Sequence, residues 1–258
     1  MNITIEMIQM MLVAISIAAA ASLLGSFAIL KRMALVGDAL SHVALPGLAL
    51  ALIFNFSPFL GAMVFLIAAT LGIWFLEYQS RLPIETIVGV FFAASLALGT
   101  LITPNHELLE ALLGNITNLS QNEALASIIL SLFLIVLLIM FRKKLALNMV
   151  SQEMAQSIGI KNKRLELIYL LIFALAVALG IKFVGALLMG SLVIIPAASA
   201  KNIAKSLRSF MSISVIFGVF SSALGVYVSY LYNLPPGPIF ILISTAIFII
   251  SLIARKFK

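Results

Sequence analysis

Long apolar runs of about 17–24 residues, the length that a transmembrane helix requires, dominate the sequence and are separated by short polar segments. Strands of a membrane β-barrel instead alternate between apolar and polar residues over about ten residues. Only helices and closed barrels satisfy their backbone polar groups in lipid, so the continuous runs predict an all-α, polytopic integral membrane protein with 8–9 transmembrane helices. The candidate spans cover residues 7–30, 33–54, 59–76, 84–102, 124–141, 167–181, 183–200, 210–232 and a last span ending at Arg255 and Lys256.

The composition supports lipid as the solvent. Hydrophobic residues make up 63% and charged residues 10% of the 258 residues, against about 45–50% and about 25% in a soluble domain. A chain of this length has too much surface to hide that excess in one core. The absence of cysteine excludes disulfides and thiolate metal sites. The first 30 residues lack the basic start of a signal peptide, so we expect a retained span and one domain over residues 1–258.

Positive charge predicts the orientation, because cytoplasmic loops are enriched in Lys and Arg. The loops 55–58, 103–123 and 233–238 contain neither residue, and Lys182 is the sole exception to the alternation. We expect a cytoplasmic C-terminus, with the N-terminus outside for nine spans and on the other side if one segment is re-entrant. The basic clusters are too small to indicate a nucleic-acid partner. They fall on one side of the membrane, at residues 31–32, 81, 142–144, 161–164, 201–208 and 255–258.

An acidic and an imidazole side chain occur together in the second span. Asp38 is the only aspartate of the chain, and His42, one of two histidines, follows four residues later. Residues i and i+4 of a helix share a face, with Cβ atoms about 5–6 Å apart, so the two side chains can share a divalent cation. Ionisable groups in a span cost about 2.5–3.5 kcal/mol and are functional candidates for that reason. Two copies meeting at a dimer axis would supply the four ligands that zinc prefers.

Two structural roles remain open for this pair. Asp38 and His42 can hydrogen-bond each other across one helical turn. Alternatively, Asp38 can cap the second helix close to the membrane surface, since it follows Arg32 by six residues. Pro46 removes a backbone donor, so we expect the helix to bend there.

Two other ionisable residues favour a structural interpretation. Glu85 begins the fourth span, where an anion gains from the helix dipole, and a role in the transport pathway is the alternative. His106 lies in an external loop, and Glu110 at the fifth position of that segment rules out the His-Glu-x-x-His zinc motif. The alternative for His106 is a docking surface for an external binding protein.

A cytoplasmic segment at about residues 148–162 has the pattern of a short helix between long spans. Ser151 can cap it, Glu153 suits its first turn, and Gly159 is a natural stop. Such a helix is suited to docking in a partner's groove, whereas an idle surface linker is the alternative. No Walker A pattern occurs in the sequence, so any ATP hydrolysis must come from a separate chain and we do not expect an enzyme.

Several segments together resemble the zinc/manganese/iron ABC permease family. They are residues 36–48 and 150–160, the stretch at 183–202 with its Ile-Ile-Pro-Ala-Ala-Ser-Ala run, and the Leu-Pro-Pro-Gly-Pro turn at 234–238. Residues 112–116 match an external element of the family, with Leu113 in place of phenylalanine. The resemblance covers nearly the whole chain and implies the ABC importer permease fold.

The resemblance also implies function. It implies a homodimeric permease in the bacterial inner membrane, with cytoplasmic ABC ATPase subunits and an extracytoplasmic metal-binding protein. Asp38 and His42 match the family's Asp-x-x-x-His pair in the metal pathway, and the segment from Ser151 through Ala155 to Gly159 matches its coupling helix. The transported ion is expected to be zinc, with manganese or iron as alternatives, and no cofactor is expected to stay bound.

Three other classes fit less well. A permease for a metal chelate or vitamin needs a wide cavity rather than an acid–imidazole pair. A secondary carrier usually buries several carboxylates and shows inverted repeats, which we do not find. An intramembrane enzyme needs a nucleophile–base or metalloprotease motif.

Overall fold

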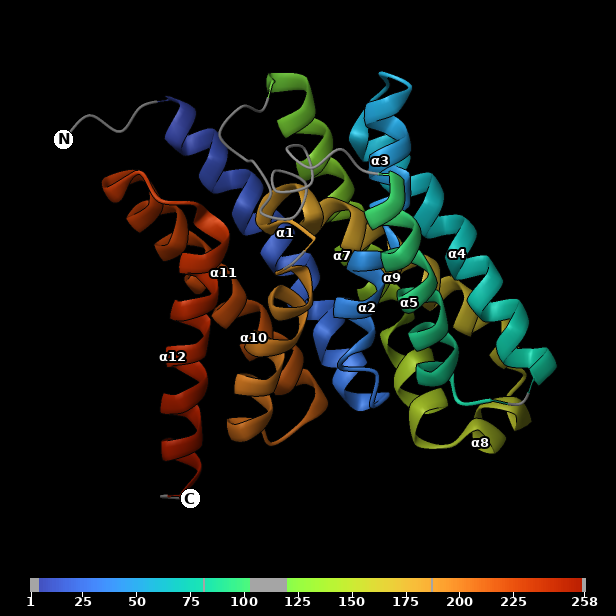
Figure 1. The fold of residues 1–258 in the computed structure, drawn as a ribbon. Helices are drawn as coiled ribbons and strands as arrows, with labels where there is room; N and C mark the ends of the chain where they lie inside the picture. Colours follow the sequence, from blue (N-terminus) through green and yellow to red (C-terminus); the bar gives the residue numbers. More distant parts are fainter. Residues whose placement is uncertain (1–4, 81, 103–119, 187, 257–258) are drawn as a thin grey trace.

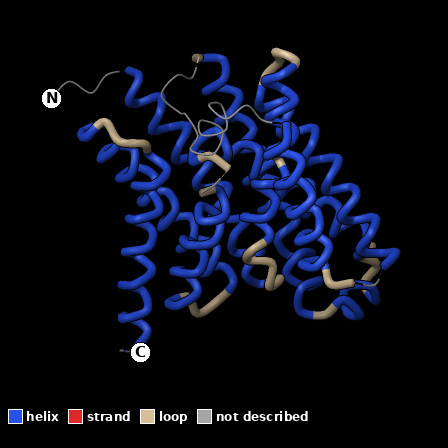
Figure 2. The backbone as a smooth tube through the Cα atoms, in the orientation of Figure 1, coloured by secondary structure: helices blue, strands red, loops and turns tan. Residues whose placement is uncertain are grey.

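The computed structural model describes residues 5–80, 82–102, 120–186 and 188–256, and every regular element in that part of the chain is an α-helix (Figures 1 and 2). The prediction of an all-α fold is therefore confirmed. The helices are α1 (Ile5–Leu30), α2 (Val36–Val43), α3 (Leu45–Ile53), α4 (Pro58–Ser80), α5 (Ile84–Ile102), α7 (Gln121–Val150), α8 (Gln152–Ser157), α9 (Asn162–Val184), α10 (Met189–Ile203), α11 (Leu207–Tyr232) and α12 (Pro236–Lys256).

Eight segments of the described chain are long and apolar enough to cross a membrane. The helix α10 is not among them, because its 15 residues span only about 22 Å against a hydrocarbon thickness of about 30 Å. The span predicted at residues 183–200 was wrong at its start, since the chain up to Val184 still belongs to α9. Gly185 ends α9 with φ 80°, a conformation that glycine adopts far more readily than other residues.

Two other predicted boundaries were wrong. The fifth span was expected to end at Phe141, but α7 continues through Arg142–Lys144 to Val150. Arg and Lys are good helix formers, and their long side chains can reach a membrane surface from within a helix. The sixth span was expected to start at Leu167, whereas α9 begins at Asn162.

The second predicted span consists of two helices. The break lies at Ala44, between α2 and α3, two residues before Pro46 in the first turn of α3. Proline has no N–H, so it cannot donate to the carbonyl of His42 one turn earlier, and it is favoured at the start of a helix. The predicted bend is thus confirmed as an interruption of the helix.

The helix α1 lies in the middle of the bundle and packs against α7, α10 and α11. Small residues make this possible, since a Cβ on Gly25 would overlap the carbonyl of Val193 on α10. The hydroxyl of Ser214 on α11 donates a 2.7 Å hydrogen bond to the carbonyl of Ser22 on α1. Close backbone approach and buried hydroxyls therefore hold the core together.

The chain termini lie at opposite ends of the bundle (Figure 1). The start of α1 and the turn between α3 and α4 lie at one end, whereas α8 and the C-terminal end of α12 lie at the other. This arrangement matches nine passes in which α10 is a short one. The end with α8 and the C-terminus is the one that positive charge predicts to be cytoplasmic.

Candidate functional site

The helix α2 carries both candidate metal ligands. Asp38 lies in its first turn and His42 in its last turn, each half-buried. The imidazole of His42 packs edge-on against Phe92 of α5, with ring centroids 5.3 Å apart. Its Nδ1 atom is buried and has no hydrogen-bond partner among the described residues. Burying a polar nitrogen without a hydrogen-bond partner costs free energy. The Nδ1 atom of His42 is therefore available to bind a metal ion or another ligand.

Neither structural role that the spacing left open is present in the described part of the chain. The N-cap of α2 is Leu35, and no side chain caps the helix. Asp38 and His42 form neither an ion pair nor a hydrogen bond with each other. Among the described residues, no hydrogen bond of the Asp38 side chain is seen, and the Asp38 backbone carbonyl accepts a hydrogen bond from the Ser41 hydroxyl at 2.6 Å. Among the described residues, the carboxylate and the imidazole therefore take part in no hydrogen bond or ion pair that holds the fold.

The helix α10 sets the position of Asp38. A Cβ on Gly190 would lie 2.6 Å from Cβ and 2.8 Å from Cα of Asp38, so only glycine fits there without a backbone shift. The neighbouring residue of α2, Gly37, lies close to α9, because a Cβ on Gly37 would make ordinary van der Waals contact with Phe173 at 3.5 Å. The candidate ligands thus lie where α2 meets α5, α9 and α10.

In the described part of the chain, the candidate pair Asp38 and His42 offers two side chains to a metal ion. No group of three or more His, Cys, Asp or Glu side chains that could hold a metal occurs among the described residues. Zinc prefers four ligands. Completing the shell at Asp38 and His42 would require water or donors from another chain.

A buried ion pair lies where α1 ends and α9 begins, and the sequence did not reveal it. The ammonium of Lys31 pairs with Glu166, whose side chain is only 7% exposed. The Tyr78 hydroxyl of α4 donates to the other carboxylate oxygen at 3.4 Å, and the Lys31 ammonium lies 5.4 Å from the centre of the Tyr169 ring. The pair therefore joins the ends of three helices.

Burial lowers the pKa of Lys31 from 10.5 to about 8, and the carboxylates of Glu77 and Glu85 offset part of that effect. The sequence contained a signal for Glu166. It lies three and seven residues before Tyr169 and Phe173, on the buried face of α9. Because that helix was expected to start only at Leu167, Glu166 was placed in the charged segment before the span.

The predicted short cytoplasmic helix is present as α8. The Ser151 side chain caps it by accepting a 3.2 Å hydrogen bond from the Met154 backbone N–H, and Glu153 lies in its first turn. Ala155 is fully buried, and Gly159 follows the helix with φ 83°. The local structure predicted for this segment is thus confirmed, whereas its docking to an ATPase stays a prediction.

Three large apolar residues of this segment are exposed. Val150, Met154 and Ile158 are 82%, 56% and 64% exposed, at the end of α7, within α8 and just after α8. Large apolar side chains exposed near one another in sequence are candidates for an interaction surface.

The structure describes one of the two other ionisable residues considered from the sequence, Glu85 and His106. Glu85 lies exposed in the first turn of α5, as its dipole role requires. His106 and the element at 112–116 lie outside the described residues.

Comparison with known proteins places the chain in a family. Over 245 residues it is 31% identical to the manganese transport system membrane protein MntC of Listeria monocytogenes, covering 93% of this chain and 88% of that protein. It is 32% identical over 238 residues to the high-affinity zinc uptake system membrane protein ZnuB of Haemophilus influenzae, covering 90% and 91%.

Among solved structures, PsaBC from Streptococcus pneumoniae in complex with Fab superposes with a TM-score of 0.84 at 28% identity, over 96% of this chain and 91% of that one. The expected permease fold is therefore confirmed. The model of the ABC 3 transport family matches residues 4–255. Because that match spans nearly the whole sequence, the chain belongs to the ABC 3 transport family.

Proposed function

We propose that this chain is the membrane-spanning permease subunit of an ATP-driven importer that brings a divalent transition metal into the cell, with zinc as the first candidate. The observation that carries the proposal is the Asp38–His42 pair. It places a carboxylate and a buried imidazole nitrogen without a hydrogen-bond partner on one helix of a candidate span, and neither group forms an ion pair with another described side chain. Groups that are costly in a membrane and lack a structural partner are expected to act on a substrate.

The chemistry of the pair supports zinc, because imidazole suits zinc, iron, copper and nickel, whereas manganese prefers oxygen ligands. The relatives do not separate the metals, since one named for manganese and one named for zinc are 31% and 32% identical to the chain. Manganese is therefore the second candidate, supported by that relative and by the Asp38 carboxylate, and iron is the third.

The cytoplasmic surface supports a separate ATPase. The sequence holds no Walker A pattern, so the energy of ATP must enter through another chain. The exposed apolar residues Val150, Met154 and Ile158 form a surface that a partner's groove can cover. A homodimer would bring a second Asp38–His42 pair, and an extracytoplasmic metal-binding protein would deliver the ion at the opposite end. The complex would lie in the bacterial inner membrane with the C-terminus in the cytoplasm.

Metal accumulation tests this proposal. Cells without their own zinc and manganese importers would express the chain together with an ABC ATPase and a metal-binding protein from the same organism, and the zinc, manganese and iron content would be measured by mass spectrometry. We expect accumulation of one of these metals, with zinc first, and its loss when the ATPase lacks its Walker A lysine. Accumulation of none of the metals, with the complex assembled, would refute the proposal.

A further inference from the structure

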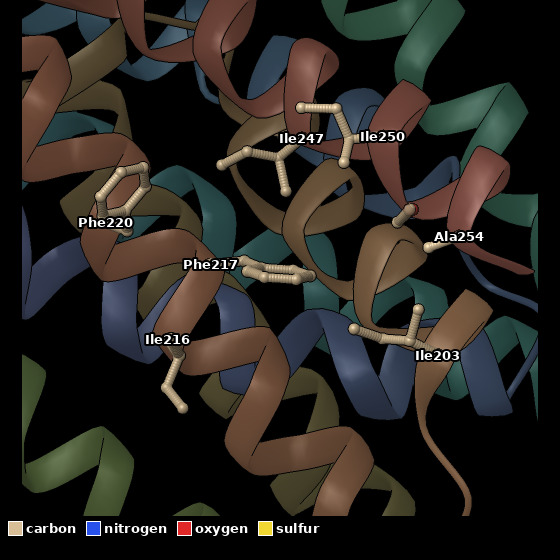
Figure 3. Close-up of a pocket in the computed structure, with 8 residues that line it drawn as sticks. Ile203, Ile216, Phe217, Phe220, Ile247, Ile250 and Ala254 are labelled. Atoms are coloured by element: carbon tan, nitrogen blue, oxygen red, sulfur yellow. The ribbon is translucent and has the colours of Figure 1, made fainter.

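An apolar groove runs along the outer side of α11 and α12, next to the end of α10. It has a volume of about 410 Å³, within the roughly 300–1,000 Å³ typical of small-molecule pockets. Figure 3 shows its side chains arranged around Phe217. The residues that line it are Ile203, Ile216, Phe217, Phe220, Ile247, Ile250, Ser251 and Ala254.

The groove offers no polar group to a ligand. Ser251 is the one polar residue among those that line it. Its hydroxyl donates to the Phe248 carbonyl at 2.7 Å and accepts from the Asn202 amide at 2.9 Å. An occupant is therefore held by apolar contact alone, as a hydrocarbon chain would be.

The groove lies on the outer face of two helices, α11 and α12, that are both candidate membrane spans. Ile216, Phe220 and Ile250 are 60%, 56% and 64% exposed within this chain. One end of the groove lies near the C-terminal end of α12, because Ala254 stands two residues before the end of that helix and Ile203 is the last residue of α10. Figure 1 shows this end of α12 at the same end of the bundle as α8.

Unbalanced positive charge surrounds that end of the groove. The chain contains no Asp or Glu after Glu166, so α10, α11 and α12 carry no carboxylate. Five exposed basic residues stand in the adjoining segments, and none of them forms an ion pair with a described carboxylate. These basic residues are Lys201, Lys205, Arg208, Arg255 and Lys256.

We propose that this groove binds an anionic phospholipid of the cytoplasmic leaflet, with an acyl chain along Phe217 and the headgroup phosphate among the five basic residues. Basic clusters beside a membrane span attract anionic lipids, and basic pockets between spans on the cytoplasmic side bind their headgroups. Because an acyl chain already lies in hydrocarbon, its fit to the groove depends on packing, and the preference for an anionic lipid comes from the basic residues. The apolar groove would thus contact the acyl chain of a lipid, and the basic residues would contact the phosphate of the same lipid.

A second copy of the chain fits this surface less well. Symmetric dimers bury the same patch of both subunits against each other. Pairing here would bring Lys205 and Arg255 of one copy towards the same residues of the other, without a carboxylate between them, and like charges in an interface are costly.

Native mass spectrometry of the purified full-length chain, titrated with phosphatidylglycerol or phosphatidylcholine of equal chain length, tests the proposal. We expect at least tenfold tighter binding of phosphatidylglycerol. The preference should disappear in a variant with Gln at all five basic positions and should persist with Lys143→Gln and Lys144→Gln, two exposed residues of α7. Equal binding of both lipids by the unaltered chain would overturn the proposal.

A second variant tests the groove separately from the charges. Ala254→Trp fills the groove and should weaken phosphatidylglycerol binding about tenfold, whereas Ala126→Trp on the exposed face of α7 should not. Glycerol 3-phosphate, which has no acyl chains, should not compete. If Ala254→Trp changes the oligomeric state and leaves lipid binding unaltered, a second copy occupies the groove and the lipid proposal is wrong. Elution profile and thermal unfolding confirm that each variant is folded.

Discussion

Gly190 on α10 and Asp38 on α2 approach so closely that a Cβ on Gly190 would lie 2.6 Å from Asp38 Cβ and 2.9 Å from the Asp38 backbone nitrogen. The backbone of α10 therefore determines where the candidate ligand stands. With 15 residues, α10 is shorter than each of the eight candidate spans, so a short helix contacts the candidate ligand Asp38.

Gly190→Ala is expected to displace α2 and to lower metal uptake at least severalfold. The added methyl group meets backbone atoms of Asp38 that cannot move aside, and such overpacking costs about 1–3 kcal/mol. Uptake and thermal unfolding of the variant measure both effects. Gly89→Ala is the matched control, because nothing lies within 4 Å of its Cβ position and alanine favours a helix by up to about 1 kcal/mol. Normal uptake with Gly190→Ala would contradict this account of the contact.

The exposed apolar surface around α8 makes a second prediction. Met154→Glu combined with Ile158→Glu should reduce co-purification of the ATPase at least tenfold, because a charge would have to be buried in the interface. Membrane levels of the chain should stay the same, since both side chains point into solvent. Gln156→Glu adds a charge at another exposed position of α8 and should retain the ATPase. Full retention by the double variant would show that this surface does not dock the partner.

The Lys31–Glu166 pair predicts strong coupling between two residues 135 positions apart. Glu166→Ala leaves Lys31 as a buried, unpaired charge and should destabilise the protein by about 3–5 kcal/mol. Replacing both residues by Met should cost much less than the sum of the single changes. Unfolding in detergent of the four members of this cycle provides the measurement. Additive effects would mean that the pair contributes no coupling.

The lowered pKa of Lys31 predicts a pH dependence. Its value in the folded protein is about 8 against 10.5 ordinarily, so between these pH values the unfolded chain binds more protons. Stability should therefore rise with pH across that window, by at most about 3.5 kcal/mol at roughly 1.4 kcal/mol per pKa unit. Below pH 8 the cost of the buried charge is present in full.

Unfolding measured from pH 7 to 10.5 checks this expectation. The Lys31→Met variant should lack the rise, whereas Lys143→Met, at an exposed position of α7, should keep it. An identical slope in the Lys31→Met variant would assign the dependence to another group.

The sequence was sufficient to predict the long spans, because lipid demands about 20 apolar residues in a row and the chain displays them. It also predicted α8, because capping and stop residues such as Ser151 and Gly159 act locally. The Asp38–His42 pair was identifiable since ionisable residues are rare in spans.

Features that depend on contacts between distant residues could not be predicted. The contact of Gly190 with Asp38 exists only because α10 packs against α2, which the sequence does not show. Glu166 was not recognised as part of a helix, because the predicted start of that helix was five residues too late. The break between α2 and α3 was anticipated from Pro46, but not its position at Ala44. Apolar composition alone also could not separate α10 from a full span, because Gly185 shifts its start.

The most direct test of the account is metal uptake by cells in which Asp38 or His42 of this chain is replaced by Ala, at matched levels of the chain in the membrane. We predict that zinc and manganese accumulation falls to that of cells lacking the chain, while Ser41→Ala, on the same helix with its hydroxyl bonded to the backbone, retains uptake. Uptake equal to that of the unaltered chain in either Ala variant would contradict the assignment of this pair to the metal path.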